Sequence, residues 1–301
     1  MPGSKYRNPV FVAGMPRSGT TLIHGILCNS GLYFPMPETH FFSHAACGMP
    51  ERDFSRKDQD KIWRVLTKRS RIEVDKESIY ELESKREIFE YIIGTFNKDK
   101  IDTFLEKTPR HVLFYNEILS YYPDARFICM VREPKNVVSS QLTHTTKKGK
   151  SVIRLALLYK KITTAILEIR ANSNVLVLKY EDLTDKTESV LKTVCEFLNI
   201  PFSPRLLDDV AAPPGIITAQ AFWQERNLGW NEIRKSNPDK WRQFLDDGQA
   251  SLVNYMTHEN AVQFGYTLPY RWAGVGRGVG QDISKLLVPR EFKKIFSKVH
   301  G

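Results

Sequence analysis

A short apolar run that leads directly into a glycine loop constrains this chain more than any other feature of its sequence. Residues 9–13 (PVFVA) are followed at once by the loop GMPRSGTT, residues 14–21, and then by a helix-like segment, residues 22–29. A buried strand, a tight turn and a helix in immediate succession are typical of folds with a parallel sheet. The pattern therefore predicts that the fold begins with a strand, a phosphate-binding loop and a helix.

The rest of the chain alternates in the same way. Apolar runs predict further buried strands at residues 102–105, 126–131 and 174–178. Helical patterns lie at residues 56–69, 76–96, 110–121, 134–145, 152–171 and 187–198. Strands that alternate with helices predict a doubly wound α/β fold, with a mostly parallel central sheet flanked by helices and a P-loop-like first turn.

We expect a single domain over residues 1–301, with its core at about residues 8–200. Prolines, glycines and tryptophans gather between residues 201 and 238. They predict a C-terminal lid or loop region over about residues 201–250. Residues 251–301 would then form a C-terminal helical segment.

The chain is basic, with 44 Lys and Arg against 34 Asp and Glu and a net charge of +10. Such a balance favours a polyanionic partner: nucleic acid, an anionic membrane surface or a phosphorylated small molecule. No apolar run is long and uncharged enough for a transmembrane helix, so no integral membrane span is expected. The polar start of the chain lacks the apolar stretch of a signal peptide, which predicts a cytoplasmic protein unless an N-terminal anchor has been removed.

The glycine loop has the Gly-x-x-x-x-Gly spacing of a Walker A loop. Its glycines allow tight turns, and the N–H groups at the following helix start attract an anion. Thr20 stands where Walker loops carry a lysine, which argues against hydrolysis of a nucleoside triphosphate. Arg17 supplies a cation instead, and its guanidinium can donate two hydrogen bonds to one anionic group. A P-loop kinase- or NTPase-like nucleotide-binding protein without the Walker lysine is the alternative.

The segment PRSGTTL, residues 16–22, resembles the 5′-phosphosulfate loop of the PAPS-dependent sulfotransferases. In that family the loop holds the 5′-phosphate and the sulfuryl group of 3′-phosphoadenylyl sulfate (PAPS). The resemblance implies in-line transfer of a sulfuryl group from PAPS to a hydroxyl or amine acceptor, with release of PAP, by an enzyme of the EC 2.8.2 type. It implies no metal, because Lys and Arg can supply the positive charge. The loop residues implied to bind the cofactor are Arg17, Ser18, Gly19, Thr20 and Thr21.

A pair of residues farther along resembles the family's 3′-phosphate site. Arg132 ends a predicted strand and Ser140 follows eight residues later, the spacing of the family's Arg and Ser contacts. Pro134 suits a helix start, so Arg132 would lie at the edge of the sheet where ligands bind in open α/β folds.

Two more segments follow in the order of the family's motifs. Tyr180, in the segment YEDL, resembles a tyrosine that lies near the adenine. The basic residues between 234 and 242 resemble the RKG…W stretch that closes over the 3′-phosphate, although a serine replaces the glycine. Which of them reaches the phosphate stays open, and the candidates are Arg234, Lys235, Ser236 and Lys240.

Sulfuryl transfer needs a base that takes the acceptor's proton, and Glu38 and His40 are the candidates. Glu38 lies 21 residues after Arg17, which resembles the spacing in glutamate-base enzymes of the tyrosylprotein and carbohydrate types. We favour Glu38, while His40 stays open and His111 is a weaker candidate.

Lys107, in the segment LEKTP, resembles the lysine that glutamate-type sulfotransferases place near the bridging oxygen. There it would stabilise charge on the leaving oxygen. An ordinary ion pair with Glu106 or another neighbour is the competing interpretation.

The acceptor is not identified by the sequence. Aromatic residues between 201 and 230 fit a small molecule, a sugar, a lipid or a peptide. No nucleic acid partner is expected, because the basic clusters follow predicted strands and do not alternate with aromatic residues on one surface. The oligomeric state is left open.

Overall fold

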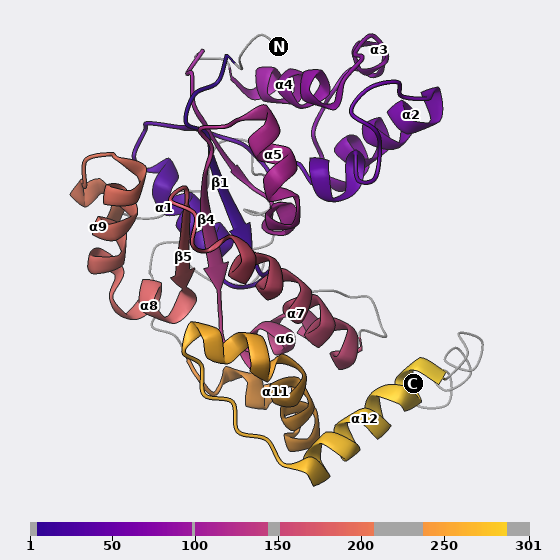
Figure 1. Ribbon diagram of the computed structural model, residues 1–301, viewed down its shortest axis with the longest axis vertical. Helices are drawn as coiled ribbons and strands as arrows, with labels where there is room; N and C mark the ends of the chain where they lie inside the picture. The colour runs from indigo at the N-terminus through magenta and orange to yellow at the C-terminus, as the bar shows by residue number, and fades with distance from the viewer. Residues whose placement is uncertain (1–4, 98–99, 144–150, 208–236, 288–301) are drawn as a thin grey trace, which may run out of the picture. The chain divides into compact units, whose positions relative to one another are not determined.

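The computed structural model describes residues 5–97, 100–143, 151–207 and 237–287. Its central sheet has the strand order β2-β3-β1-β4-β5. Figure 1 shows β1, β4 and β5 side by side. The strands are β1 (Val10–Gly14), β2 (Phe34–Pro35), β3 (Phe104–Lys107), β4 (Arg126–Val131) and β5 (Val175–Lys179). β1 pairs in parallel with β3 and β4, and β2 pairs in parallel with β3. The predicted α/β fold with a parallel central sheet is confirmed.

Helices cover both faces of this sheet. Val10 and Val12 of β1 point into a cluster with residues of α1 (Thr20–Cys28) and α9 (Thr187–Leu198). Phe11, between them, points to the other face, where its ring centroid lies 5.3 Å from that of Phe127. Because side chains alternate between the faces of a strand, a sheet covered on both sides needs apolar residues at nearly every position. Figure 1 shows α9 and α5 (Tyr115–Tyr121) on opposite sides of the strands.

The chain groups into two compact units. The first comprises Met1–Met130 and Ile169–Ser236 and carries nearly the whole sheet. The second comprises Val131–Glu168 and Asn237–Gly301 and is helical in its described part. The expectation of a single domain stays a prediction. Most of the expected lid, residues 208–236, lies outside the described residues.

Most predicted helices form near their expected places, but the prediction of one helix over residues 76–96 is wrong. The segment forms α3 (Lys76–Tyr80) and α4 (Lys85–Phe96). Ser84 starts the second helix, because its hydroxyl accepts a hydrogen bond from the N–H of Glu87 at 3.1 Å, and its own N–H donates to the Glu87 carboxylate at 3.2 Å. The other helices and turns of the first unit are η1 (Phe41–Ala45), α2 (Arg56–Arg64), η2 (Val65–Arg69), η3 (Pro109–Phe114), α8 (Tyr180–Asp185) and η4 (Pro204–Leu207).

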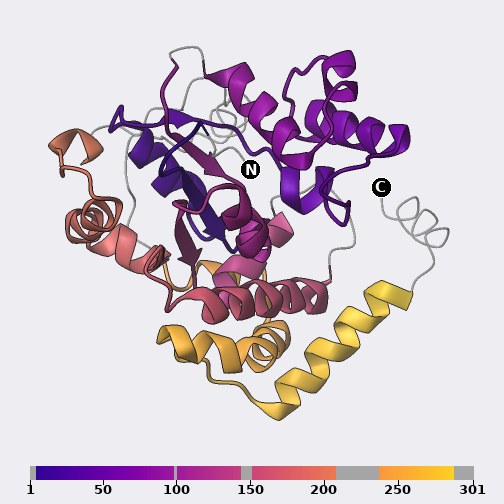
Figure 2. The same ribbon diagram turned by 45° about the horizontal axis from the view of Figure 1, so that its top comes forward.

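The second unit packs its helices closely. It contains α6 (Pro134–Thr143), α7 (Val152–Ile169), η5 (Lys240–Gln243), α11 (Asp247–Ala261), η6 (Val262–Phe264) and α12 (Trp272–Leu287). Figure 2 shows α12, in yellow, beside α11, in orange, and a Cβ on Gly278 of α12 would lie 2.5 Å from the carbonyl oxygen of Gly248. Asp282 of α12 accepts a hydrogen bond from the N–H of Val152 at 2.8 Å and so caps the start of α7. None of the helices described is both long and apolar enough to cross a membrane.

Candidate active site

The loop after β1 has a conformation that depends on glycine. Gly14 has φ 118°, and a Cβ there would lie 2.3 Å from the carbonyl oxygen of Met130. Ser18 is buried, and its hydroxyl donates to the carbonyl oxygens of Met15 at 2.5 Å and Met130 at 3.0 Å. These bonds brace the loop against the end of β4. Direct contact of Ser18 with a cofactor stays a prediction.

The first turn of α1 presents N–H groups that the helix itself does not use. Gly19, with φ 90°, is the residue before the helix and provides no side-chain cap. The first helical hydrogen bond runs from the N–H of Ile23 to the carbonyl of Gly19 at 3.1 Å, so the N–H groups of Thr20 and Thr21 have no acceptor within the helix. The helix dipole is positive at this end, and Arg17 lies just before it. The predicted phosphate loop therefore has the geometry of an anion site.

Tyr180 lies against the same loop. It is the first residue of α8, directly after β5. Its ring is so close to Gly19 that a Cβ on this glycine would lie 2.5 Å from Cδ2 of the tyrosine. The structure thus brings the tyrosine of the third predicted motif to the phosphate loop, while its contact with an adenine stays a prediction.

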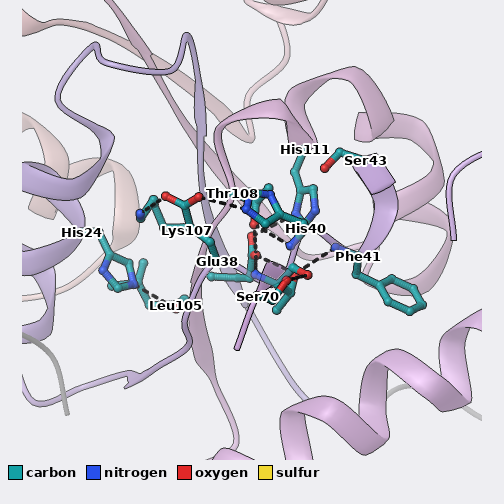
Figure 3. A network of polar contacts seen from close by, with 12 residues as sticks. His24, Glu38, His40, Phe41, Ser43, Ser70, Leu105, Lys107, Thr108 and His111 are labelled. Atoms are coloured by element: carbon teal, nitrogen blue, oxygen red, sulfur yellow. Dashed lines mark hydrogen bonds and ion pairs between the residues drawn. The ribbon is translucent and has the colours of Figure 1, made fainter. Parts of the chain in front are cut away.

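Glu38, Lys107 and His40 meet at the carboxyl end of β3 (Figure 3). The ammonium of Lys107 pairs with Oε1 of Glu38, and Nε2 of His40 lies 3.3 Å from Oε2 of the same carboxylate. The side chain of Lys107 is only 4% exposed, whereas that of Glu38 is 36% exposed. Lys107 stands beside Val12 in the register of β3 and β1, two residues before the phosphate loop begins. The predicted base and the predicted cation are therefore direct partners.

The charges around Glu38 determine its protonation. Burial by itself raises the pKa of this carboxyl, but the attraction of Lys107, followed by that of His40, outweighs burial and leaves the pKa below its usual value. Glu38 is therefore an ionised carboxylate at neutral pH. A carboxylate with one half-exposed side is able to accept a proton.

His40 has the opposite balance. Burial lowers its pKa to about 4, although the carboxylate of Glu38 acts in the other direction. The imidazole is neutral at pH 7, and its Nε2 must carry the proton, because the carboxylate that it faces only accepts. Its backbone has φ 50°, in the left-handed region. His40 thus turns a neutral ring toward the Glu38 carboxylate, with Nε2 at 3.3 Å from Oε2.

Two buried groups around this trio were missed by the sequence analysis or misjudged. His24 of α1 lies 3.4 Å from the carbonyl oxygen of Leu105, and burial, then Lys107, lowers its pKa to about 4. Its place as the third residue of the predicted helix-like segment 22–29 was the only signal for it in the sequence. Lys107 does form an ion pair, as the competing interpretation expected, but its partner is Glu38 and not Glu106. Glu106 points to the other face of β3, where His111, the weaker base candidate, is fully buried with Nδ1 3.0 Å from the Glu106 carboxylate.

The second unit holds the predicted 3′-phosphate residues. Arg132 directly follows β4, and its carbonyl accepts a hydrogen bond from the hydroxyl of Tyr159 at 3.0 Å. α6 begins at Pro134, as predicted, and carries Ser140, which is half-buried. Arg132 therefore lies just before α6, and Ser140 lies on that helix.

The end of the basic segment docks at the start of α6. Asn136 donates to the carbonyl of Pro238 at 3.1 Å, and the ammonium of Lys135 lies 4.5 Å from the ring centroid of the buried Trp241. Lys240 is the first residue of η5 and therefore belongs to the segment that packs on α6, the helix that carries Ser140. The other three candidates, Arg234, Lys235 and Ser236, lie outside the described residues. Within the described ranges no cluster of three His, Cys, Asp or Glu side chains is placed to hold a metal ion.

Comparison with known sequences finds one family model and two relatives. The model of the Sulfotransferase family matches residues 9–204. An uncharacterized protein of Aquifex aeolicus (strain VF5) is 23% identical over 255 residues, which is 80% of this chain and 31% of the relative. Protein-tyrosine sulfotransferase 1 of Danio rerio is 25% identical over 206 residues, which is 66% of this chain and 55% of the relative. The matches thus span about a third and about half of these relatives' lengths.

Two solved structures have a similar fold. One is the sulfotransferase domain from the curacin biosynthetic pathway, with a TM-score of 0.59 and 20% identity over 88% of this chain and 100% of that chain. The other is the sulfotransferase domain of the Synechococcus PCC 7002 olefin synthase, with a TM-score of 0.59 and 20% identity over 89% of this chain and 100% of that chain. At this identity the likeness shows the shared fold.

Proposed function

Since the chain belongs to the Sulfotransferase family, we propose that it moves a sulfuryl group from PAPS to a hydroxyl or amine acceptor and releases PAP. The observation that carries the proposal is the contact of Glu38 with Lys107, on the strand beside β1 and its phosphate loop. A proton acceptor and a buried cation are the two groups that such a transfer requires of the protein. Here they lie at one edge of the sheet.

The residues of the loop fit the 5′ end of PAPS. The N–H groups of Gly19, Thr20 and Thr21 would hold its phosphosulfate together with the guanidinium of Arg17, and Ser18 would keep the loop in shape through its two carbonyl contacts. The ring of Tyr180 leaves no room for a side chain at residue 19. Only glycine fits there, so the backbone of the loop stays bare at that point, which supports the fit. We assign Tyr180 to the nucleotide, close to the loop. When bound, PAPS supplies the activated sulfuryl group.

The 3′-phosphate is assigned to the second unit. Arg132 and Ser140 would bind it, together with Lys240. This assignment rests on the docking of residues 237–243 at the start of α6, the helix that carries Ser140.

Glu38 would take the proton from the acceptor. We favour it over His40, because Nε2 of His40 faces the Glu38 carboxylate at 3.3 Å and its Nδ1 is buried. His40 would hold the carboxylate in place. This arrangement assigns the base to Glu38 and orientation to His40.

Lys107 would serve two anions in turn. It holds the Glu38 carboxylate before the reaction and would stabilise the leaving oxygen during it. An ammonium attracted toward the leaving oxygen attracts Glu38 less, so the pKa of Glu38 rises and the carboxylate becomes a stronger base as the acceptor loses its proton.

Calorimetry with nucleotides in the absence of Mg²⁺ tests the nucleotide assignment. We expect PAP to bind at least about tenfold more tightly than adenosine 5′-phosphate, because its additional phosphate would gain charge-assisted hydrogen bonds from the second unit. Tighter binding of ATP with Mg²⁺ than of PAP would favour the kinase-like alternative. Equal affinity for adenosine 5′-phosphosulfate and PAPS would contradict the 3′-phosphate assignment.

A transfer assay tests the reaction and the acceptor together. The panel comprises a phenol, a sugar, a hydroxylated lipid and a tyrosine peptide, with PAP release and product mass as readouts. The peptide is tried first, because a relative bears the name Protein-tyrosine sulfotransferase 1. A purified protein that binds PAP but transfers nothing from PAPS to any of the four classes would count against the proposal.

A further inference from the structure

Glu106 is a fully buried carboxylate in the strand that carries Lys107. The two are neighbours in β3, so their side chains point to opposite faces of the sheet. Lys107 faces Glu38, whereas Glu106 faces η3 and the segment between β2 and η1. The proposed mechanism gives Glu106 no chemical step.

Four hydrogen bonds converge on this carboxylate. Oε1 accepts from the N–H of Thr39 at 3.3 Å, from the hydroxyl of Thr39 at 2.9 Å and from the hydroxyl of Thr108 at 2.6 Å. Oε2 accepts from Nδ1 of His111 at 3.0 Å. The donors come from both sides of the site, because Thr39 stands between Glu38 and His40 and Thr108 directly follows Lys107.

The two threonines extend this network to the backbone around the trio. The hydroxyl of Thr108 accepts from the N–H of His40 at 3.3 Å, and that of Thr39 accepts from the N–H of Phe41 at 3.3 Å. The carbonyl of Thr39 accepts from the hydroxyl of Ser70 at 2.7 Å (Figure 3). Through these contacts the left-handed conformation of His40 is held in place, although a residue with a Cβ rarely adopts it.

A buried carboxylate is a poor choice for stability alone. It costs desolvation free energy that an apolar side chain of similar size avoids, and hydrogen bonds at best offset that cost. What such a group provides is a fixed set of directions for its donors. Here the donors are the neighbours of Glu38, His40 and Lys107.

We propose that Glu106 is a positioning residue, which through Thr39 and Thr108 fixes the segment of Glu38 and His40 to the end of β3 so that Glu38 meets Lys107. The inference deepens the proposed sulfotransferase function and rests on it for its effect on turnover. Its structural part, the placement of residues 38–41 by Glu106, stands independently of the reaction.

Glu106→Gln is the first variant, since it keeps the size of the side chain and removes the charge and one acceptor. We expect kcat to fall by roughly 10- to 100-fold, because a small displacement of a reacting group is that costly. The KM for PAPS should change less than about twofold, because the phosphate loop makes no contact in this network.

Thr39→Val and Thr39→Ser form a second pair, which keeps the test valid where Glu106→Gln does not fold. Valine removes the hydroxyl and should lower kcat by about tenfold, while serine restores the hydrogen bond to Glu106 and should recover most of it. Thr257→Val is the matched control: this threonine is equally buried, and its hydroxyl donates only along its own helix, to the carbonyl of Val253 at 2.7 Å. Thr257→Val should alter the melting temperature and leave kcat unchanged.

Hydrogen exchange of the peptide covering residues 36–45 supplies a readout that needs no substrate. We expect exchange to accelerate by about tenfold or more in Glu106→Gln and Thr39→Val, but not in Thr39→Ser or in the control. Unchanged exchange would overturn the inference whatever the activity, and so would faster exchange with unchanged kcat. A wild-type protein without transferase activity would refute the proposed function instead, and exchange alone would then decide whether Glu106 places the segment.

Discussion

Lys107→Met is the most informative single substitution, because it removes the cation that the proposed base and the leaving oxygen share. Methionine has nearly the length of lysine and suits a side chain that is 4% exposed. Removal of a preorganised charge from a transition state costs about 3–4 kcal/mol, so kcat should fall by roughly 10²- to 10³-fold. PAP affinity should also fall, but less than kcat, because the leaving oxygen that this cation would contact stays on PAP as part of its 5′-phosphate.

The same substitution changes stability in a way that depends on pH. Loss of an exposed ion pair costs about 0–1 kcal/mol and loss of one partner of a buried pair about 3–5 kcal/mol. Since the Glu38 side chain keeps 36% of its exposure, we expect a loss of about 1–3 kcal/mol at pH 7.

The direction of the pH effect follows from the pKa of Glu38. In the wild type the folded-state pKa of Glu38 lies below its usual value. The ionised carboxylate therefore stabilises the fold at pH values above the usual pKa of glutamate, and this stabilisation is lost as the pH falls through the folded-state pKa. In Lys107→Met the largest lowering influence is gone, burial dominates, and the pKa rises above its usual value. The carboxylate then destabilises the fold at neutral pH, and acidification relieves this. The difference in melting temperature between the two proteins should therefore shrink as pH falls below about 4.

Lys85→Met is the matched control for this experiment. Lys85 is also buried, with 8% of its side chain exposed, and pairs with Glu117 at 2.8 Å between α4 and α5. It should lower the melting temperature to a similar degree without changing kcat. The reasoning would be refuted if Lys107→Met kept kcat within about threefold of the wild type, because no transition-state charge would then depend on it.

Three further predictions concern the nucleotide loop, the second unit and the base. Arg17→Ala should lower kcat/KM by about 10²- to 10³-fold, measured with saturating acceptor, and near wild-type turnover would remove Arg17 from the site. Arg132→Ala should mainly raise the KM for PAPS, because a contact remote from sulfur is alike in ground and transition states; unchanged PAP affinity by calorimetry would contradict this. Glu38→Gln should lower kcat by roughly 10²- to 10⁴-fold with PAP affinity nearly unchanged, and His40→Ala should cost much less. The reverse ranking of these two would make His40 the base.

The fold and the phosphate loop could be predicted because their signals are local. The apolar run before Gly14 and the helix-like segment after Thr21 flank the loop directly in the sequence. The structure explains the glycine at position 14, because its φ of 118° and the close approach of Met130 exclude a side chain. The boundary between α3 and α4 was equally local but was overlooked. The capping box of Ser84 and Glu87 was present in the sequence, and it outweighs the helical periodicity on either side.

The partners of Glu38 depend on the register of the sheet, which no local pattern gives. The contact with Lys107 joins residues 69 positions apart, and it exists because β2 lies beside β3. The sequence did contain the alternation of side chains in β3 between the two faces of the sheet. Once residues 104–107 form a strand, Leu105 and Lys107 share one face and Phe104 and Glu106 share the other.

This alternation explains why Lys107 and Glu106 have different roles at this edge of the sheet. Helix α1 covers the face of Leu105 and Lys107. The lysine therefore lies on the side of the phosphate loop, and its charge helps to lower the pKa of His24. The face of Glu106 is the aromatic one, where Phe42 packs against His111 with ring centroids 5.2 Å apart, and Glu106 is fully buried there. A shift of β3 by one residue would bury the ammonium among aromatic rings and turn Glu106 toward the phosphosulfate, where its charge would repel the substrate. The register between Val12 and Lys107 therefore constrains the chemistry as strongly as the identity of either charged residue.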